Sequence, residues 1–194
     1  GTPTLEPTST PEPVPPGPTL TFSGSTSKRT EAFSVAGTLR IAYSVASQSR
    51  FIVNLDSPDG TTMTSVANLI GSGKVTTWVY GATGPVYLDV IAGGPWKITV
   101  TEAEPESSLP PQRFSGATDV TTAPVTFVGG ETVTWSFKGD GTFIVDLIDP
   151  SDGSLVDNVV NTIGRGSDST QVTDAGEYAL DVTANGAWTI SATP

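Results

Sequence analysis

The chain has 194 residues and a net charge of −11, and it contains neither cysteine nor histidine. Disulfides and thiolate metal sites are therefore excluded, and the commonest general base and transition-metal ligand are missing. The acidic charge argues against nucleic acid as a partner, and no apolar run is long enough to cross a bilayer. We expect a monomer that binds no nucleic acid and does not insert into a membrane.

The first 18 residues are a low-complexity run of proline, threonine, serine and glutamate. Such a segment has almost no apolar surface to bury and favours the extended polyproline II conformation. We expect residues 1–18 to be a disordered tether that holds folded domains away from a cell surface or a neighbouring domain. The alternative is a chain end without a role of its own.

The rest of the chain contains one sequence pattern twice. The Phe-Ser-Gly of residues 22–24 returns at 114–116, and Trp96 returns as Trp188, each after 92 residues. A period this long indicates duplicated domains rather than a solenoid of small units. The sequence therefore predicts an internal duplication.

Each repeat alternates apolar and polar residues with a period of two, as in Phe51, Val53 and Leu55. Short runs of this kind, bounded by Asp-Gly and Asn-Gly pairs, are typical of half-buried strands joined by tight turns. The predicted fold is all-β, with two tandem β-sandwiches of jelly-roll or Greek-key type. The expected parts are a first sandwich at 19–101, a Pro-rich linker at 102–113 and a second sandwich at 114–194.

Several short motifs recur in both repeats in the same order. In the first repeat they include F-x-G at 22–24, F-x-V-x-L at 51–55 and G-x-W-x-I at 94–98. With these motifs the repeats resemble the bacterial pre-peptidase C-terminal domain and its collagen-binding relatives. The resemblance implies accessory, non-catalytic modules of secreted bacterial proteins, which bind extracellular ligands and often calcium.

Catalysis needs a nucleophile with a base, a metal site or a pair of carboxylates in one cleft. Without histidine and cysteine the remaining options are Ser-Lys and carboxylate pairs, and Ser72-Gly73-Lys74 has the wrong spacing for a Ser-Lys pair. The carboxylates of the second repeat lie mainly in Asp-Gly turns and at outward strand positions. We therefore expect that the protein is not an enzyme.

A group of aspartates in the second repeat is a candidate calcium site. Asp146, Asp149, Asp152 and Asp157 fall within one strand and its turn. Calcium takes six to eight oxygen ligands, which clustered aspartates on loops can supply. The alternative is that aspartate simply suits an Asp-Gly turn. Calcium is the one cofactor that the sequence suggests.

Three aromatic residues of the first repeat have no aromatic counterpart in the second. Val79 matches an inward valine of the second repeat, so Trp78 and Tyr80 are expected to point outward, and so is Tyr87. With residues 81–85 as a short hairpin loop, the three rings would share one exposed face beside Asp89. Such aromatic platforms bind sugar rings or peptide side chains. The alternative is that the rings cover an inter-domain contact or the second face of a sheet.

The two repeats differ in charge. Residues 20–101 carry six basic and four acidic groups, a net +2, whereas residues 114–194 carry two basic and eleven acidic groups, a net −9. We expect a non-catalytic module pair of a bacterial secreted or cell-surface protein, which binds an extracellular carbohydrate or protein mainly through the first repeat. The alternative is a purely structural spacer, or stalk, that holds a distal domain off the surface.

Overall fold

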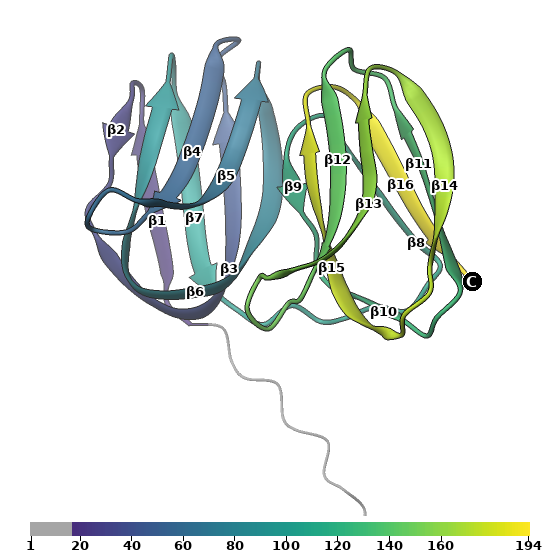
Figure 1. The fold of residues 1–194 in the computed structure, drawn as a ribbon. Coiled ribbons are helices and arrows are strands. Elements are labelled where there is room, and N and C mark those ends of the chain that lie inside the picture. Colours follow the sequence, from purple (N-terminus) through teal and green to yellow (C-terminus); the bar gives the residue numbers. More distant parts are fainter. Residues whose placement is uncertain (1–16) are drawn as a thin grey trace, which may run out of the picture.

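The computed structural model describes residues 17–194, and these fold as two β-sandwiches side by side (Figure 1). This confirms the predicted all-β class. Residues 1–16 of the predicted tether lie outside the described residues. Within residues 17–194, no helix is long and apolar enough to cross a membrane.

The first sandwich has two long strands that take part in both of its layers. The first half of β6 pairs with the second half of β3, while the second half of β6 lies between the first half of β3 and β4. The strand order is β1-β7-β3-β6-β4-β5, and β2 pairs with the second half of β6. The strands are β1 (Thr19–Gly24), β2 (Lys28–Arg29), β3 (Phe33–Val45), β4 (Arg50–Asp56), β5 (Thr62–Ile70), β6 (Gly73–Ala92) and β7 (Trp96–Glu102).

The hairpin loop that we expected at 81–85 does not form, because these residues lie within the continuous strand β6. Two glycines let this strand bend: Gly81 and Gly84 have φ angles of +67° and +86°. Opposite them, the register of β3 shifts between Gly37 and Leu39, which marks a bulge. A bulge and glycines with positive φ bend a strand without ending it. The Gly-Ala-Thr-Gly-Pro sequence is therefore a bend and not a turn.

The second sandwich consists of two separate antiparallel sheets, β14-β11-β16-β8 and β10-β15-β12-β13, with β9 paired to β15. Gly129 and Gly130, both with φ of +97°, separate β10 from β11, at the place where β3 is continuous in the first sandwich. The strands are β8 (Gln112–Gly116), β9 (Val120–Thr121), β10 (Val125–Phe127), β11 (Glu131–Phe137), β12 (Thr142–Ile148), β13 (Leu155–Ile163), β14 (Gly166–Val172), β15 (Gly176–Ala184) and β16 (Trp188–Thr193).

Each sandwich has its own apolar core. Trp96 and Trp188 are buried in the two cores, as predicted. Each indole Nε1 donates a 3.0 Å hydrogen bond to a main-chain carbonyl, of Thr26 in the first sandwich and of Thr118 in the second. Equivalent residues of the two sequence repeats therefore make equivalent contacts.

Candidate functional site

The aromatic platform predicted from the sequence does not form. Tyr87 is only 4% exposed, and the guanidinium of Arg29 lies 4.2 Å above its ring. Because β6 is continuous, Tyr80 and Tyr87 lie on the order of 20 Å apart along the strand. Asp89 is half-buried beside Tyr87, across from Arg29 on β2. Tyr87 and Asp89 are thus separated from the other two predicted binding residues.

Trp78 and Tyr80 both reach the boundary between the two sandwiches. Trp78 is half-buried and lies across from Arg40 on β3. Tyr80 is only 7% exposed, so its predicted exposure is wrong. Its hydroxyl donates a hydrogen bond of 2.8 Å to the main-chain carbonyl of Thr122 in the second sandwich. Tyr80 therefore covers an inter-domain contact, which is the alternative interpretation of the unmatched aromatic residues.

The contact is made by residues 118–122, which we call the docking segment. It lies against one side of the first sandwich, which we call the seam. At the seam two edge strands of opposite layers come together, β5 and the first half of β6. The Thr118 hydroxyl donates to the Asn68 carbonyl at 2.6 Å, and the Thr121 amide donates to the Thr77 hydroxyl at 2.9 Å. Thr77 and Thr118 are buried. The segment thus closes the side of the first sandwich with specific hydrogen bonds.

Tyr43 lies beneath the docking segment, inside the seam. Its ring packs on Phe51 at a centroid distance of 5.4 Å. Burial raises the pKa of the Tyr43 hydroxyl, which Thr118 and Asp119 approach. This buried hydroxyl makes no hydrogen bond of ordinary geometry within residues 17–194. Thr118 and Asp119 of the second sandwich therefore lie next to the hydroxyl of this buried tyrosine of the first.

A second contact between the sandwiches is a close approach of two main chains. A Cβ atom on Gly81 would overlap main-chain atoms of Asp152, and one on Gly153 would lie 3.0 Å from the carbonyl oxygen of Tyr80. Both glycines have positive φ, +67° and +77°. Only glycine combines this conformation with such close packing. The bend in β6 and the Asp-Gly turn after β12 therefore fit each other.

A cleft of about 260 Å³ lies between the sandwiches, next to these contacts. One wall comes from β6 and β5 and includes Trp78 and Met63, and the other comes from the second sandwich and includes Asp152 and Asp181. An apolar ring opposite carboxylates is a common arrangement in sites for small ligands. The cleft joins two predicted ligand residues, Trp78 and Tyr80, with one predicted metal residue, Asp152.

Two carboxylates near the cleft have altered acidity. Burial raises the pKa of Asp181 and of Asp119. A neighbouring carboxylate adds to each effect: Asp146 raises the pKa of Asp181, and Asp181 raises that of Asp119. The Thr121 hydroxyl donates to Asp181 at 2.7 Å, and the Ala184 amide donates to Asp119 at 2.8 Å. Reasoning from the sequence missed these two residues, because neither lies in a recognisable motif.

The four aspartates of the predicted calcium site do not converge. Asp146 accepts a hydrogen bond of 2.6 Å from the side chain of Asn158, while Asp149 and Asp152 each accept one from a main-chain amide two residues later. Asp157 binds the amide of Asn158 at 2.8 Å. Residues 17–194 contain no group of three or more acidic side chains placed to hold a metal. These aspartates stabilise turns and a strand edge.

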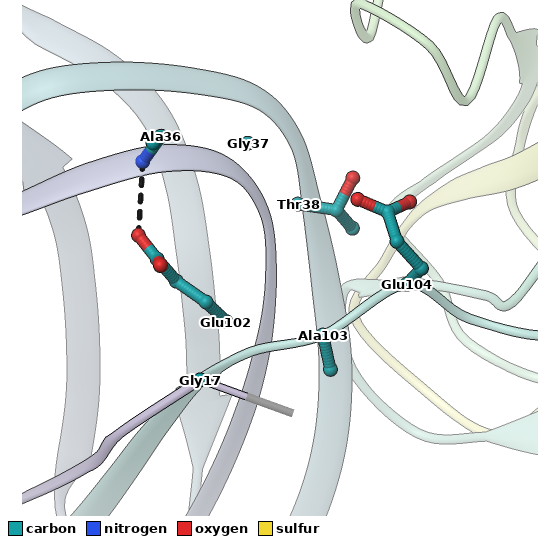
Figure 2. Close-up of a pocket in the computed structure, with 7 residues that line it drawn as sticks. All are labelled: Gly17, Ala36, Gly37, Thr38, Glu102, Ala103 and Glu104. Atoms are coloured by element: carbon teal, nitrogen blue, oxygen red, sulfur yellow. Dashed lines mark hydrogen bonds between the residues drawn. The ribbon is translucent and has the colours of Figure 1, made fainter. Parts of the chain in front are cut away.

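Another hollow, of about 210 Å³, lies at the edge of the first sandwich (Figure 2). The carboxylate of Glu102 points into it and accepts a hydrogen bond of 2.9 Å from the amide of Ala36, and Glu104 lies beside Thr38. The rest of its lining is glycine, alanine and main chain. The hollow offers two carboxylates, of which Glu102 is engaged, and no aromatic surface, so it is a weaker ligand site than the inter-domain cleft.

No protein-family model matches the chain, and no curated protein matches it. The resemblance to the pre-peptidase C-terminal domain therefore stays a prediction. Some solved structures show a distant likeness. The conserved protein of unknown function PA5104 from Pseudomonas aeruginosa PAO1 is 12% identical with a TM-score of 0.30, over 90% of this chain and 80% of that one.

The PBSX exported protein XepA is also 12% identical, with a TM-score of 0.28 over 88% of this chain and 85% of that one. The M60 catalytic domain with the CBM51-1 and CBM51-2 domains from Clostridium perfringens ZmpB is 7% identical, with a TM-score of 0.29 over 88% of this chain and 34% of that one. At these TM-scores the likeness carries no argument about what the chain does.

Proposed function

We propose that the chain is a non-catalytic, extracytoplasmic spacer in which the two sandwiches act as one rigid unit. The observation that carries the proposal is the docking segment on the seam, where Thr118, Thr121 and Tyr80 form hydrogen bonds across the boundary. Domains joined only by a linker move relative to each other, and buried hydrogen bonds across a close-packed boundary oppose that motion because separation would leave their groups unpaired. A fixed orientation is what a spacer needs.

Composition supports the rest of the proposal. The Pro/Thr-rich residues 1–18 are of the kind that tether modules at a bacterial cell surface, which favours an extracellular or surface location. The chain lacks histidine and cysteine, and its predicted carboxylate cluster is engaged in turns. These features support a structural role over a catalytic one.

Because the chain has no cysteine, two introduced cysteines can carry spin labels at chosen sites. Thr76 on β6 and Thr183 on β15 are exposed strand residues, one in each sandwich. In the variant with Thr76→Cys and Thr183→Cys, we expect electron paramagnetic resonance to give one narrow distance distribution. A broad distribution spanning many orientations would contradict a rigid spacer.

The inter-domain cleft supports a second candidate function, binding of an extracellular carbohydrate or protein side chain. The supporting observation is that Trp78 is half-buried, lines the cleft and faces Asp152 and Asp181. Titration with soluble oligosaccharides or peptides should change the tryptophan fluorescence of the wild type and leave that of Trp78→Gln unchanged. An equal response in both proteins would place the ligand elsewhere.

A further inference from the structure

The contact between the sandwiches is asymmetric: the docking segment of the second sandwich binds the seam of the first. Each sandwich carries one segment equivalent to the docking segment and one side equivalent to the seam. Within the chain, only the docking segment of the second sandwich and the seam of the first are in contact. The other pair lies at opposite ends of the molecule, where Figure 1 shows β2 at the far side of the first sandwich and β14 at the far side of the second. Asymmetric contacts of this kind can continue from one molecule to the next.

Residues 26–30 of the first sandwich have the same local structure as the docking segment. The Thr30 hydroxyl accepts from the Leu88 amide at 2.9 Å, as the Thr122 hydroxyl does from Leu180 at 3.0 Å. Strand β2 pairs with the second half of β6 as β9 pairs with β15. Residues 26–30 are thus held in the conformation that docks at the inter-domain contact.

The two segments differ in exposure, as expected if only one of them has its partner. Thr118, which lies against the seam, is 3% exposed, whereas Thr26 and residues 27–29 are exposed. Their side chains are threonine, serine, lysine and arginine. The segment 26–30 therefore presents a preformed, polar and positively charged surface.

The second sandwich has an equivalent seam between β13 and β14. Thr170 occupies the place of Thr77, since each is the cross-strand partner of an equivalent core residue, Val133 or Ile41. Likewise Asn161 corresponds to Asn68, because Asn161 pairs with the middle of β12 and Asn68 pairs with the middle of the equivalent strand β4. The two hydrogen-bonding positions of the occupied seam are therefore present.

This second seam is open where the first is covered. Trp135 corresponds to Tyr43. Its ring packs on that of Phe143 in the following strand, at a centroid distance of 5.5 Å, as the ring of Tyr43 packs on the strand that follows it. Tyr43 is 3% exposed beneath the docking segment, whereas Trp135 is half-buried. A half-exposed tryptophan next to an exposed sheet edge is a common feature of protein contact surfaces.

Charged residues replace apolar ones on the two open surfaces, and their signs are opposite. Lys28 stands where the docking segment has Val120, and Asp168 stands where the occupied seam has Val75. Both Lys28 and Asp168 are exposed. The sandwiches that carry them have net charges of +2 and −9. These surfaces are complementary to each other and repel their own kind.

We infer that a second copy of this chain docks its residues 26–30 on the seam between β13 and β14, so that molecules join head to tail. The contact repeats the inter-domain one, with the Thr26 hydroxyl facing the Asn161 carbonyl and the main chain of Arg29 facing Thr170. Lys28 and Asp168 supply the attraction between molecules. The inference rests on the proposed spacer function, because the array would extend a rigid unit.

The contact between molecules is weaker than the contact within one. Thr173 follows β14 where Tyr80 stands in the first sandwich, so the hydrogen bond from the tyrosine hydroxyl has no equivalent. The chain is accordingly a monomer in dilute solution, and it associates at high local concentration, as on a crowded surface. Because the attraction is between exposed charges, salt weakens it.

The test is sedimentation equilibrium of the full chain in low salt over a wide range of concentration. We expect association that increases with concentration and decreases with salt. Lys28→Glu and Asp168→Lys should each weaken the association constant about fivefold or more. The double variant, which exchanges the two charges, should restore it. Lys74→Glu, at an exposed position on the outer face of β6, changes the net charge equally and should have little effect.

Two results would overturn the inference: a wild-type chain that stays monomeric at every concentration, or an association that Lys28→Glu and Lys74→Glu weaken equally. Thermal melting of each variant shows whether it remains folded, as exposed substitutions should. A flexible spacer would appear in the spin-label distances of a dilute sample. Failure of the spacer proposal is therefore distinguishable from failure of this one.

Discussion

The hydroxyl of Tyr80 donates a hydrogen bond of 2.8 Å to the main-chain carbonyl of Thr122, and so joins the two sandwiches. Burial raises the pKa of this hydroxyl, and Glu177 and Glu104 add to the effect. The tyrosine therefore stays protonated and keeps donating over the physiological pH range. A residue that the alternation in the sequence assigns to an exposed platform is in fact part of the inter-domain contact.

Replacing Tyr80 by phenylalanine should destabilise the contact between the sandwiches. The substitution leaves the buried carbonyl of Thr122 without its partner, which costs about 1–3 kcal/mol. Chemical denaturation followed by tryptophan fluorescence measures the loss. As a control, Tyr178→Phe removes a hydroxyl whose hydrogen bond to Ala175 is long, 3.4 Å, and should change the stability by less than about 0.5 kcal/mol. Equal effects of the two substitutions would argue against the role of Tyr80.

Gly81→Ala should separate the sandwiches, because the new Cβ would overlap the main chain of Asp152. The matched control is Gly84→Ala. Gly84 also has a positive φ, +86°, but a Cβ there would meet nothing within 4 Å. Both variants bear the backbone strain, and only the first disturbs the contact. Small-angle X-ray scattering should show a larger, more variable envelope for Gly81→Ala alone, and similar envelopes for both variants would contradict the account.

The stability of the inter-domain contact should depend on Asp181. Burial raises its pKa above the ordinary 3.8, so the folded state holds the proton more tightly than the unfolded state does. The stability that protonation adds is complete below the ordinary pKa and is lost as the pH rises through the raised one. Asp181→Asn keeps an oxygen acceptor for Thr121 and removes the charge. It should therefore raise the melting temperature at neutral pH.

Below pH 3.8 the same variant should have little effect, because Asp181 is then protonated in both states. The control is Asp174→Asn, which removes one charge from an exposed position between β14 and β15. Melting curves of the two variants and the wild type over a pH series provide the measurement. A stabilisation by Asp181→Asn that is the same at acidic and neutral pH would show that the proton is not its cause.

Trp96 and Trp188 should each contribute strongly to the stability of their own sandwich. Both are buried, and each indole packs against a glycine, Gly24 or Gly116, at about 2.7 Å from the position a Cβ would take. Truncation of either tryptophan to alanine should cost about 3–5 kcal/mol. A loss below about 1 kcal/mol in denaturation experiments would show that the ring is not part of the core.

The strands and the buried tryptophans could be predicted because their residues obey local rules. Alternation with a period of two gave the inward positions of Phe51 and Val53, and the repeat gave the equivalence of Trp96 and Trp188. These inferences need only a residue's neighbours along one strand. They identified the inward residues, but alternation along one strand could not show that Arg29 covers the outward-facing Tyr87.

The site could not be predicted because it depends on a bend and on a contact between domains. Gly81 carries β6 from one layer to the other, whereas glycine and proline together usually indicate a turn. The position of Tyr80 is fixed by Thr122, which is 42 residues away in sequence. The aspartates of the Asp-Gly turn were ambiguous from the start, since the same residues suit a turn or a metal.

The central claim is that the two sandwiches form one rigid unit, and ¹⁵N relaxation of the full chain in dilute solution tests it most directly. The amides of β3 and β6 report on the first sandwich, and those of β11 and β15 report on the second. A rigid unit predicts one rotational correlation time for both sets, as expected for a body of the whole mass. Two shorter correlation times, one for each sandwich, would contradict the claim.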